Sequence, residues 1–138
     1  MTRSRLLILL TIILVSALSI GYYFYNKPMD KVEDLKSILN IDAKELYNAF
    51  DRDEDLANKS YLDKVLEVNG QVDTVMKNEN GGLVIVLSTG GEMGSVTAEL
   101  DPSIKLDHET FNKGEKITVK GVCAGKLIDV VLNRCIVK

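Results

Sequence analysis

Residues 64–77 read KVLEVNGQVDTVMK, and this stretch decides the fold class. Polar and apolar side chains alternate along it, which is typical of a strand with one buried face. The mainly apolar face consists of Leu66, Val68, Gly70 and Val72. The alternation predicts a long half-buried strand from Lys64 to Met76. Gly70 is a point where this strand could bend, because a glycine inside a strand often marks a bend.

Four further strands are predicted after this one. They are GLVIVLS (82–88), SVTAEL (95–100), EKITVKGVCAG (115–125) and DVVLNRCIVK (129–138). Glycine-containing turns separate the first three strands of the barrel, a longer segment at 101–114 follows them, and a turn at Lys126 to Ile128 joins the last two strands. Three strands in a meander, a crossover and a hairpin fit the five-stranded Greek-key barrel called the OB-fold. The expected class is therefore mainly β with helices.

An α-helix is predicted immediately before the barrel. Asp42 and Glu45 fit a capping box, with Asp42 accepting from the amide of Glu45. An apolar stripe follows at helical spacing, formed by Ala43, Leu46, Tyr47 and Phe50. Residues 42–138 are thus expected to form a helix plus an OB-fold domain. Residues 27–41 are a connector, either a tether or a short amphipathic helix.

Residues 1–26 are expected to be a membrane signal-anchor or a cleaved signal peptide. An apolar run from Leu6 to Ile20 has about the length that a helix needs to cross a bilayer. Arg3 and Arg5 precede the run, and an aromatic cluster follows it, formed by Tyr22, Tyr23, Phe24 and Tyr25. The aromatic cluster favours an anchor, since such belts lie at membrane interfaces. The basic residues predict a single-pass membrane protein whose C-terminal domain is extracytoplasmic, in the periplasm or outside the cell.

The charge of the exported part argues against a default nucleic-acid partner. With Arg3 and Arg5 set aside, 15 of the 17 basic side chains remain against 20 acidic ones. Nucleic-acid-binding OB-folds also stack bases on aromatic side chains. No Phe, Tyr or Trp lies between Tyr61 and Phe111, where the binding strands are predicted. Binding of single-stranded nucleic acid or tRNA is therefore kept as the alternative function.

Several stretches resemble the tRNA_anti-like family of bacterial OB-fold proteins. The resemblance runs from about Ile41 to Lys138, through DAKELYNAF, NKSYLDKVLEVNGQV and FNKGEKITVKGVCAGKLIDVVLNRCIV. It implies an OB-fold in an exported or membrane-attached protein. The family name refers to a distant likeness to anticodon-binding domains, so it implies a fold and not tRNA binding.

Cys123 and Cys135, the two cysteines of the chain, are candidates for a disulfide. An oxidising exported compartment favours a bridge. A tight hairpin centred on Leu127 would pair Cys135 with Val119 and leave Cys123 about 13 Å away along the strand, too far for a bond. Bonded cysteines and two buried free thiols both remain open. A cysteine next to the apolar run is absent, which excludes a lipoprotein anchor.

The sequence offers no convincing catalytic or metal site. Asp51, Asp53 and Asp55 resemble the start of a calcium loop, but Leu62 stands where the bidentate glutamate belongs. His108 lies between two acidic residues and could ligate a metal, which leaves a metal-dependent enzyme as a second alternative. We expect no enzymatic activity, no cofactor and no bound metal.

The expected function is a membrane-tethered, non-catalytic binding module. Its ligand would be an envelope protein, a glycan or a small molecule, held by loops at one end of the barrel. The candidate residues come from three turns, chosen because they flank the usual OB-fold binding face. They are Asn78, Asn80, Gly82, Gly91, Met93, Lys126 and Asp129.

Overall fold

The structure is a computed structural model that describes residues 3–26, 32, 34–79, 81–91, 94–103 and 111–138, with only the backbone described for 3–7. The chain divides into two compact units, Met1–Asp30 and Lys31–Lys138. Each unit is described by itself below.

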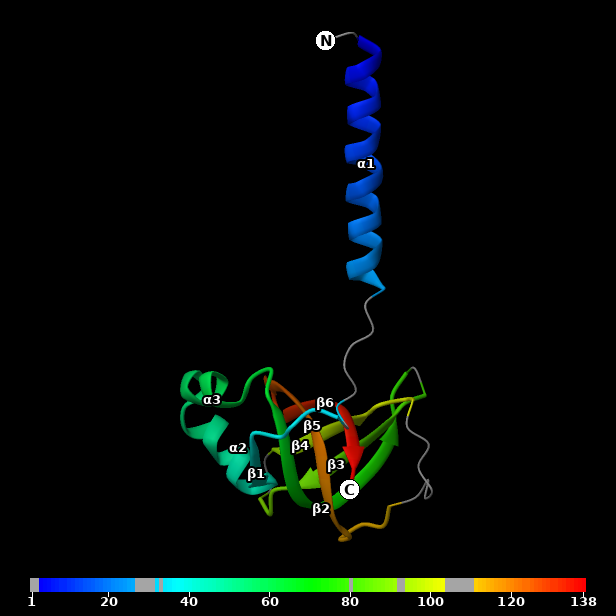
Figure 1. Ribbon diagram of the computed structural model, residues 1–138. Coiled ribbons are helices and arrows are strands. Elements are labelled where there is room, and N and C mark those ends of the chain that lie inside the picture. The colour runs from blue at the N-terminus through cyan, green and yellow to red at the C-terminus, as the bar shows by residue number, and fades with distance from the viewer. Residues whose placement is uncertain (1–2, 27–31, 33, 80, 92–93, 104–110) are drawn as a thin grey trace. The chain divides into compact units, whose positions relative to one another are not determined.

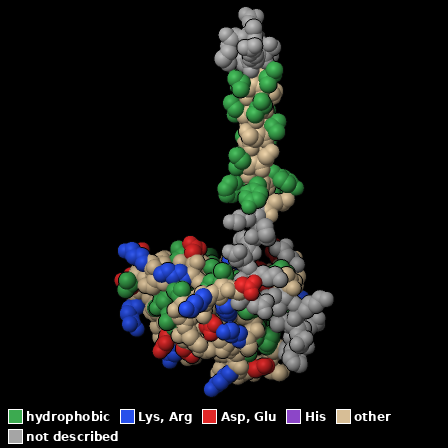
Figure 2. All heavy atoms as spheres, viewed as in Figure 1, with side chains coloured by type: hydrophobic (Ala, Val, Ile, Leu, Met, Phe, Trp, Pro, Cys, Tyr) green, Lys and Arg blue, Asp and Glu red, His purple; other side chains and the backbone are tan. Residues whose placement is uncertain are grey.

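The first unit contains one helix, α1 (Arg3–Tyr25). Its 23 residues give a length of about 35 Å at ~1.5 Å per residue. The segment Ile8–Tyr25 has a mean hydropathy of 2.0 and no buried residues. Figure 2 shows hydrophobic side chains along the described part of this helix, and the sequence has no charged residue from Ile8 to Tyr25. By length and composition, α1 is a candidate membrane span, as the sequence predicted.

The second unit contains a closed five-stranded barrel (Figure 1). Its strands are β2 (Val65–Lys77), β3 (Leu83–Ser88), β4 (Ser95–Leu100), β5 (Lys116–Lys126) and β6 (Val130–Val137). They are hydrogen-bonded in the order β2-β3-β4-β6-β5, and pairing of β2 with β5 closes the barrel. This topology is that of an OB-fold. All five predicted strands are confirmed, with bounds that differ by at most one residue.

Strand β2 bends so that its two halves pair with different partners. Its first half pairs with β5, and its second half pairs with β3. At Gly70 a Cβ atom would lie 3.1 Å from Leu87 and 3.2 Å from Ala43. A side chain at this position would be tightly packed, because Ala43 of the helix before the barrel lies close to this bend.

A sixth strand, β1 (Leu39–Asp42), pairs in parallel with the first half of β2. The sequence placed these residues mostly in the connector, and the helical alternative for the connector is wrong at Leu39–Ile41. Ile38 extends the pairing by donating its amide to the carbonyl of Val65 at 2.9 Å. Four residues are too few to show an alternating pattern, so the strand depends on its partner rather than on local sequence.

Two helices, α2 (Ala43–Arg52) and α3 (Glu54–Tyr61), precede the barrel where one was predicted. Asp42 caps α2, but it accepts from the amide of Lys44 at 2.9 Å rather than from that of Glu45. Asp53 ends α2 and caps α3 by accepting from the amide of Leu56 at 3.0 Å. The aspartates of this run thus include a helix cap, and the run is not a calcium loop.

The hydrophobic core lies inside the barrel and beneath α2. Helix α2 contributes Ala43, Leu46 and Phe50, and every other member of the core cluster also belongs to residues 41–135. Among the side chains of α1 that the structure describes, none belongs to this core. The second unit therefore has a hydrophobic core of its own and is expected to fold without the helix.

Both cysteines are free and fully buried in this core, so the disulfide hypothesis is not met in the structure. The hairpin pairs Val119 with Val137 and Cys123 with Leu132, which differs from the register expected from sequence. Cys135 lies against Gly121, two residues from Cys123. Such a diagonal separation is about 7–8 Å, too long for a bridge. Burial raises the pKa of both thiols, that of Cys135 to about 12.

Candidate functional site

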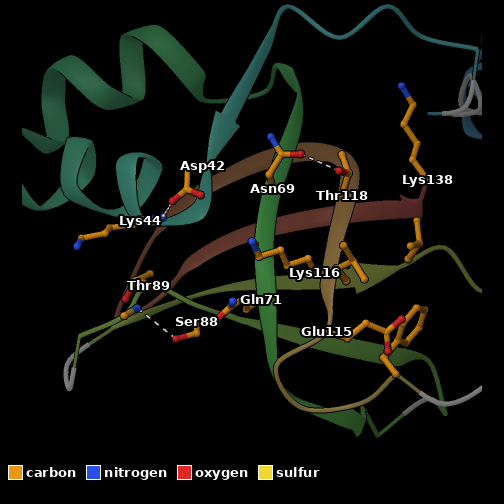
Figure 3. A pocket seen from close by; sticks show the side chains of 15 residues that line it. Asp42, Lys44, Asn69, Gln71, Ser88, Thr89, Glu115, Lys116, Thr118 and Lys138 are labelled. Atoms are coloured by element: carbon orange, nitrogen blue, oxygen red, sulfur yellow. Dashed lines mark hydrogen bonds between the residues drawn. The ribbon is translucent and has the colours of Figure 1, made fainter.

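A polar groove of about 710 Å³ lies where the start of α2, the bend of β2, the end of β3 and the start of β5 meet (Figure 3). The C-terminal residues of the chain close one side. Its lining residues are Asp42, Lys44, Asn69, Gly70, Gln71, Ser88, Thr89, Gly90, Phe111, Glu115, Lys116, Ile117, Thr118, Val137 and Lys138. Volumes of this size are typical of small-ligand sites.

Three lysines carry the positive charge of the groove. Lys44 lies in the first turn of α2, Lys116 begins β5, and Lys138 ends the chain. Lys138 is paired with Glu67 at 2.5 Å, whereas Lys44 and Lys116 form no ion pair with any described residue. Figure 3 places Lys116 near the middle of the groove, with Lys44 and Lys138 on either side. Two ammonium groups are thus available to an anionic ligand.

Glu67 connects the edge of the groove to the connector. Its carboxylate accepts hydrogen bonds from Lys138 and from the hydroxyl of Ser37. The hydrogen bond from Lys138 is the main reason why the pKa of Glu67 lies below its usual value, and the bond from Ser37 lowers it further. The carboxylate therefore stays ionised and keeps Lys138 in place at neutral pH.

Amide and hydroxyl groups form the floor of the groove. Asn69 accepts from Thr118 at 2.7 Å and donates to Asn40 on β1. These bonds fix the orientation of the Asn69 amide. Gln71, one pleat further along β2, is exposed, so its amide is accessible to a ligand. Phe111 is the one aromatic side chain among the lining residues, and it packs partly against the core.

This arrangement can hold a ligand by hydrogen bonds and charge. Fixed amides, hydroxyls and ammonium groups recognise hydroxyl-rich or anionic ligands by hydrogen bonds and charge. Among the described residues, no group of three or more His, Cys, Asp and Glu side chains is placed to hold a metal ion. His108 lies outside the described residues.

Comparison with known proteins agrees with this fold. Residues 1–137 match the family model named tRNA_anti-like. The chain belongs to the tRNA_anti-like family. The match covers nearly the whole chain and confirms the resemblance stated above.

A solved structure with the same fold comes from Klebsiella pneumoniae, where the protein is named a "putative nucleic acid-binding lipoprotein". It aligns with a TM-score of 0.58 over 81% of this tRNA_anti-like chain and 99% of its own, with 16% sequence identity. At that identity the likeness shows the fold alone. No curated protein matches the chain in sequence.

The three predicted loops of this tRNA_anti-like domain do not lie at one end of the barrel, so that part of the prediction is wrong. The turn 78–82 precedes β3, whereas the turn 89–94 follows it at the opposite end. The turn 125–129 lies beside the turn 89–94, because Asp129 accepts from the amide of Ser95 at 2.7 Å. Of the seven predicted loop residues, the five that the structure describes do not line the groove.

The predicted residues that are described have structural contacts of their own. Asn78 donates to Glu99 at 2.5 Å and accepts from the amide of Gly82 at 2.7 Å, which holds its turn together. Gly91 and Asp129 line a smaller hollow of about 270 Å³. Asn80 and Met93 lie outside the described residues.

Lys126 connects the β5–β6 hairpin to α2. Its ammonium group lies 2.8 Å from Asp51 and 4.4 Å from the centre of the Tyr47 ring. The hydrogen bond to Asp51 is the main reason why the pKa of Lys126 is raised. Since both contacts are internal to the domain, Lys126 is a packing residue more than a ligand contact.

Proposed function

We propose that this chain is a membrane-tethered, non-catalytic binding module that works outside the cytoplasm and holds an acidic glycan of the cell envelope in the polar groove. The tether is α1, whose length and hydropathy suit a membrane span. The observation that carries the ligand proposal is the pair Lys44 and Lys116, two ammonium groups beside fixed amides and hydroxyls. Carboxylate-bearing sugars offer the complementary acceptors and hydroxyls.

The double variant Lys44→Glu/Lys116→Glu is expected to weaken binding of acidic oligosaccharides at least about tenfold, equivalent to ~1.4 kcal/mol. Each substitution replaces an attractive charge with a repulsive one. The measurement is calorimetric titration of residues 31–138 with oligosaccharides released from cell-wall glycan by digestion.

The matched control is Lys59→Glu/Lys77→Glu, which changes the net charge equally at exposed residues outside the groove. This control should bind like the wild type. Equal losses in both double variants would mean that only the overall charge matters, and would contradict a site in the groove. Absence of binding by the wild type would contradict the choice of ligand.

Single-stranded nucleic acid is the second candidate ligand, favoured by the name of the Klebsiella protein with the same fold. Strands β3 and β4, the usual OB-fold platform, contain no aromatic side chain here. Each missing base stack forfeits about 1–3 kcal/mol. Titration with a labelled oligothymidylate of about 12 nucleotides, within the OB-fold site size, separates the candidates. Micromolar affinity that falls steeply with salt would favour this second function.

The extracytoplasmic location predicts that Asn48→Cys reacts with a membrane-impermeant maleimide in intact spheroplasts. Asn48 is exposed on α2, whereas both natural thiols are fully buried with raised pKa values. The natural thiols are therefore expected to stay unlabelled until the protein is denatured. The unsubstituted chain is the control. Labelling of Asn48→Cys only after the membrane is opened would place the domain in the cytoplasm.

A further inference from the structure

Exposed hydrophobic side chains gather at the end of the barrel where β1 and β2 begin. They are Ile38, Leu39, Leu62, Leu127 and Ile128. Leu127 and Ile128 form the tip of the β5–β6 hairpin and are 91% and 82% exposed, more than any other large hydrophobic residue described in the second unit. Among the described residues of that unit, the other exposed large hydrophobic side chains are Leu56 and Met76.

Strand pairing explains why these residues share one end. Leu39 begins β1 opposite Leu66, near the start of β2. The start of β2 also pairs with β5 next to the hairpin, with Val65 opposite Val122. Helix α3 ends at the same place, because a Cβ atom on Gly125 would lie 3.5 Å from Leu62. The hairpin tip lies about four residues, or ~13 Å, beyond Val122.

We propose that this end of the barrel, which we call the apolar tip, inserts into the interface of the membrane that α1 spans. The proposal rests on the tether of the proposed function. Residues 27–31 join Asn26 to Val32, a buried residue of the second unit, and span at most about 20 Å, so the domain stays close to the bilayer.

Adjacent leucine and isoleucine at a hairpin tip are otherwise unfavourable. Turns are usually polar, and two exposed side chains of this size gain nothing in water. Insertion into the boundary between head groups and acyl chains would remove their apolar surface from water. The gain is small for two residues alone, but the tether keeps the domain near the surface, so a weak interaction suffices.

Charge near the tip is nearly balanced, which favours a hydrophobic contact over an electrostatic one. Lys59, Lys64 and Lys126 lie near it, against Asp51, Asp63 and Asp129. Lys64 donates to the carbonyls at the end of α3, and Lys126 is paired with Asp51. Insertion is therefore expected in neutral lipid and should change little with salt.

A single tryptophan reports the insertion, because the chain has none of its own. The full chain carrying Leu127→Trp is reconstituted into phosphatidylcholine vesicles, with and without brominated acyl chains. Emission is expected to be blue-shifted, and brominated lipid should quench most of it. Ile128→Trp should behave in the same way. The control is Met76→Trp, 49% exposed at the end of β2, whose emission should stay water-like and unquenched.

Equal quenching at positions 127 and 76 would overturn the proposal. A blue shift at position 127 without quenching by brominated lipid would also overturn it, and would indicate a second copy or another protein as the partner. Failure of the tether is recognised separately, since alkaline extraction would then release the wild-type chain from the vesicles. Thermal melts of each variant show whether the exposed substitutions leave the fold intact.

Discussion

Phe50→Ala is expected to lower the free energy of unfolding by about 3–5 kcal/mol, the usual cost of removing a buried phenylalanine. Phe50 is 2% exposed and points from α2 into the core. The centre of its ring lies 6.1 Å from the centre of the Tyr61 ring. A domain of this size has about 5–15 kcal/mol in total. The variant should therefore lose a large part of its stability. Urea unfolding of residues 31–138, followed by circular dichroism, measures the change.

Asn48→Ala on the same helix is the matched control. Asn48 is exposed, so its removal should change the free energy of unfolding by less than about 0.5 kcal/mol. A cost below about 1 kcal/mol for Phe50→Ala would mean that α2 does not close the barrel core. The comparison thus tests the packing of the helix and not its intrinsic stability.

The strands of the barrel could be predicted because each carries its own signal. Strand β2 alternates over its whole length, and β5 and β6 contain the apolar residues that a closed barrel buries. The cap at Asp42 was also visible, since a capping aspartate acts on backbone amides only two or three residues away. Local signals of this kind do not depend on distant parts of the chain.

Features that depend on distant parts could not be predicted. Strand β1 forms because it hydrogen-bonds to β2, where Leu39 pairs with Leu66, a residue 27 positions later in the sequence. The hairpin register is shifted by irregular pairing near Lys120 and Cys123, with Arg134 in a left-handed conformation at φ 53°. A positive φ at an arginine has no sequence signal, because few such residues adopt it.

The groove escaped prediction for the same reason. Its lining comes from segments as far apart as Asp42 and Lys138, and β1 helps to build it by positioning Asn40 against Asn69. Loop residues were chosen from the usual OB-fold face instead. The free lysines at positions 44 and 116 gave the only local hint, but single exposed lysines are common on any protein surface.

The groove and the apolar tip are neighbouring surfaces of the barrel. Thr89 and Gly90 of the turn 89–94 line the groove, and Asp129 of the β5–β6 hairpin accepts from the amide of Ser95, directly after that turn.

Gly121→Ala is expected to destabilise the domain by about 1–3 kcal/mol, the usual cost of overpacking a core. A Cβ atom at this position would lie 2.3 Å from the sulfur of Cys135 and 3.2 Å from the carbonyl oxygen of Asn133. Cys135 is fully buried, so its side chain has no open space to move into. Thermal melts of residues 31–138 at neutral pH measure the effect, at about 4–8 °C per kcal/mol.

Cys135→Ala provides the rescue that separates this clash from a general intolerance of alanine. Alone, it leaves a small cavity and should cost about 1 kcal/mol. In the double variant Gly121→Ala/Cys135→Ala the sulfur is gone, and the closest side-chain atom of residue 135 is its Cβ at 3.4 Å. The double variant should therefore be more stable than Gly121→Ala, with a coupling of about 0.5–3 kcal/mol. Strictly additive losses would mean that the two residues do not touch, and that the shifted register of β5 and β6 is wrong.

Neutral pH matters for both measurements, because burial raises the pKa of Cys135 from 9.0 to about 12. The protonated thiol contributes fully below pH 9, and that contribution is lost only as the pH rises toward 12.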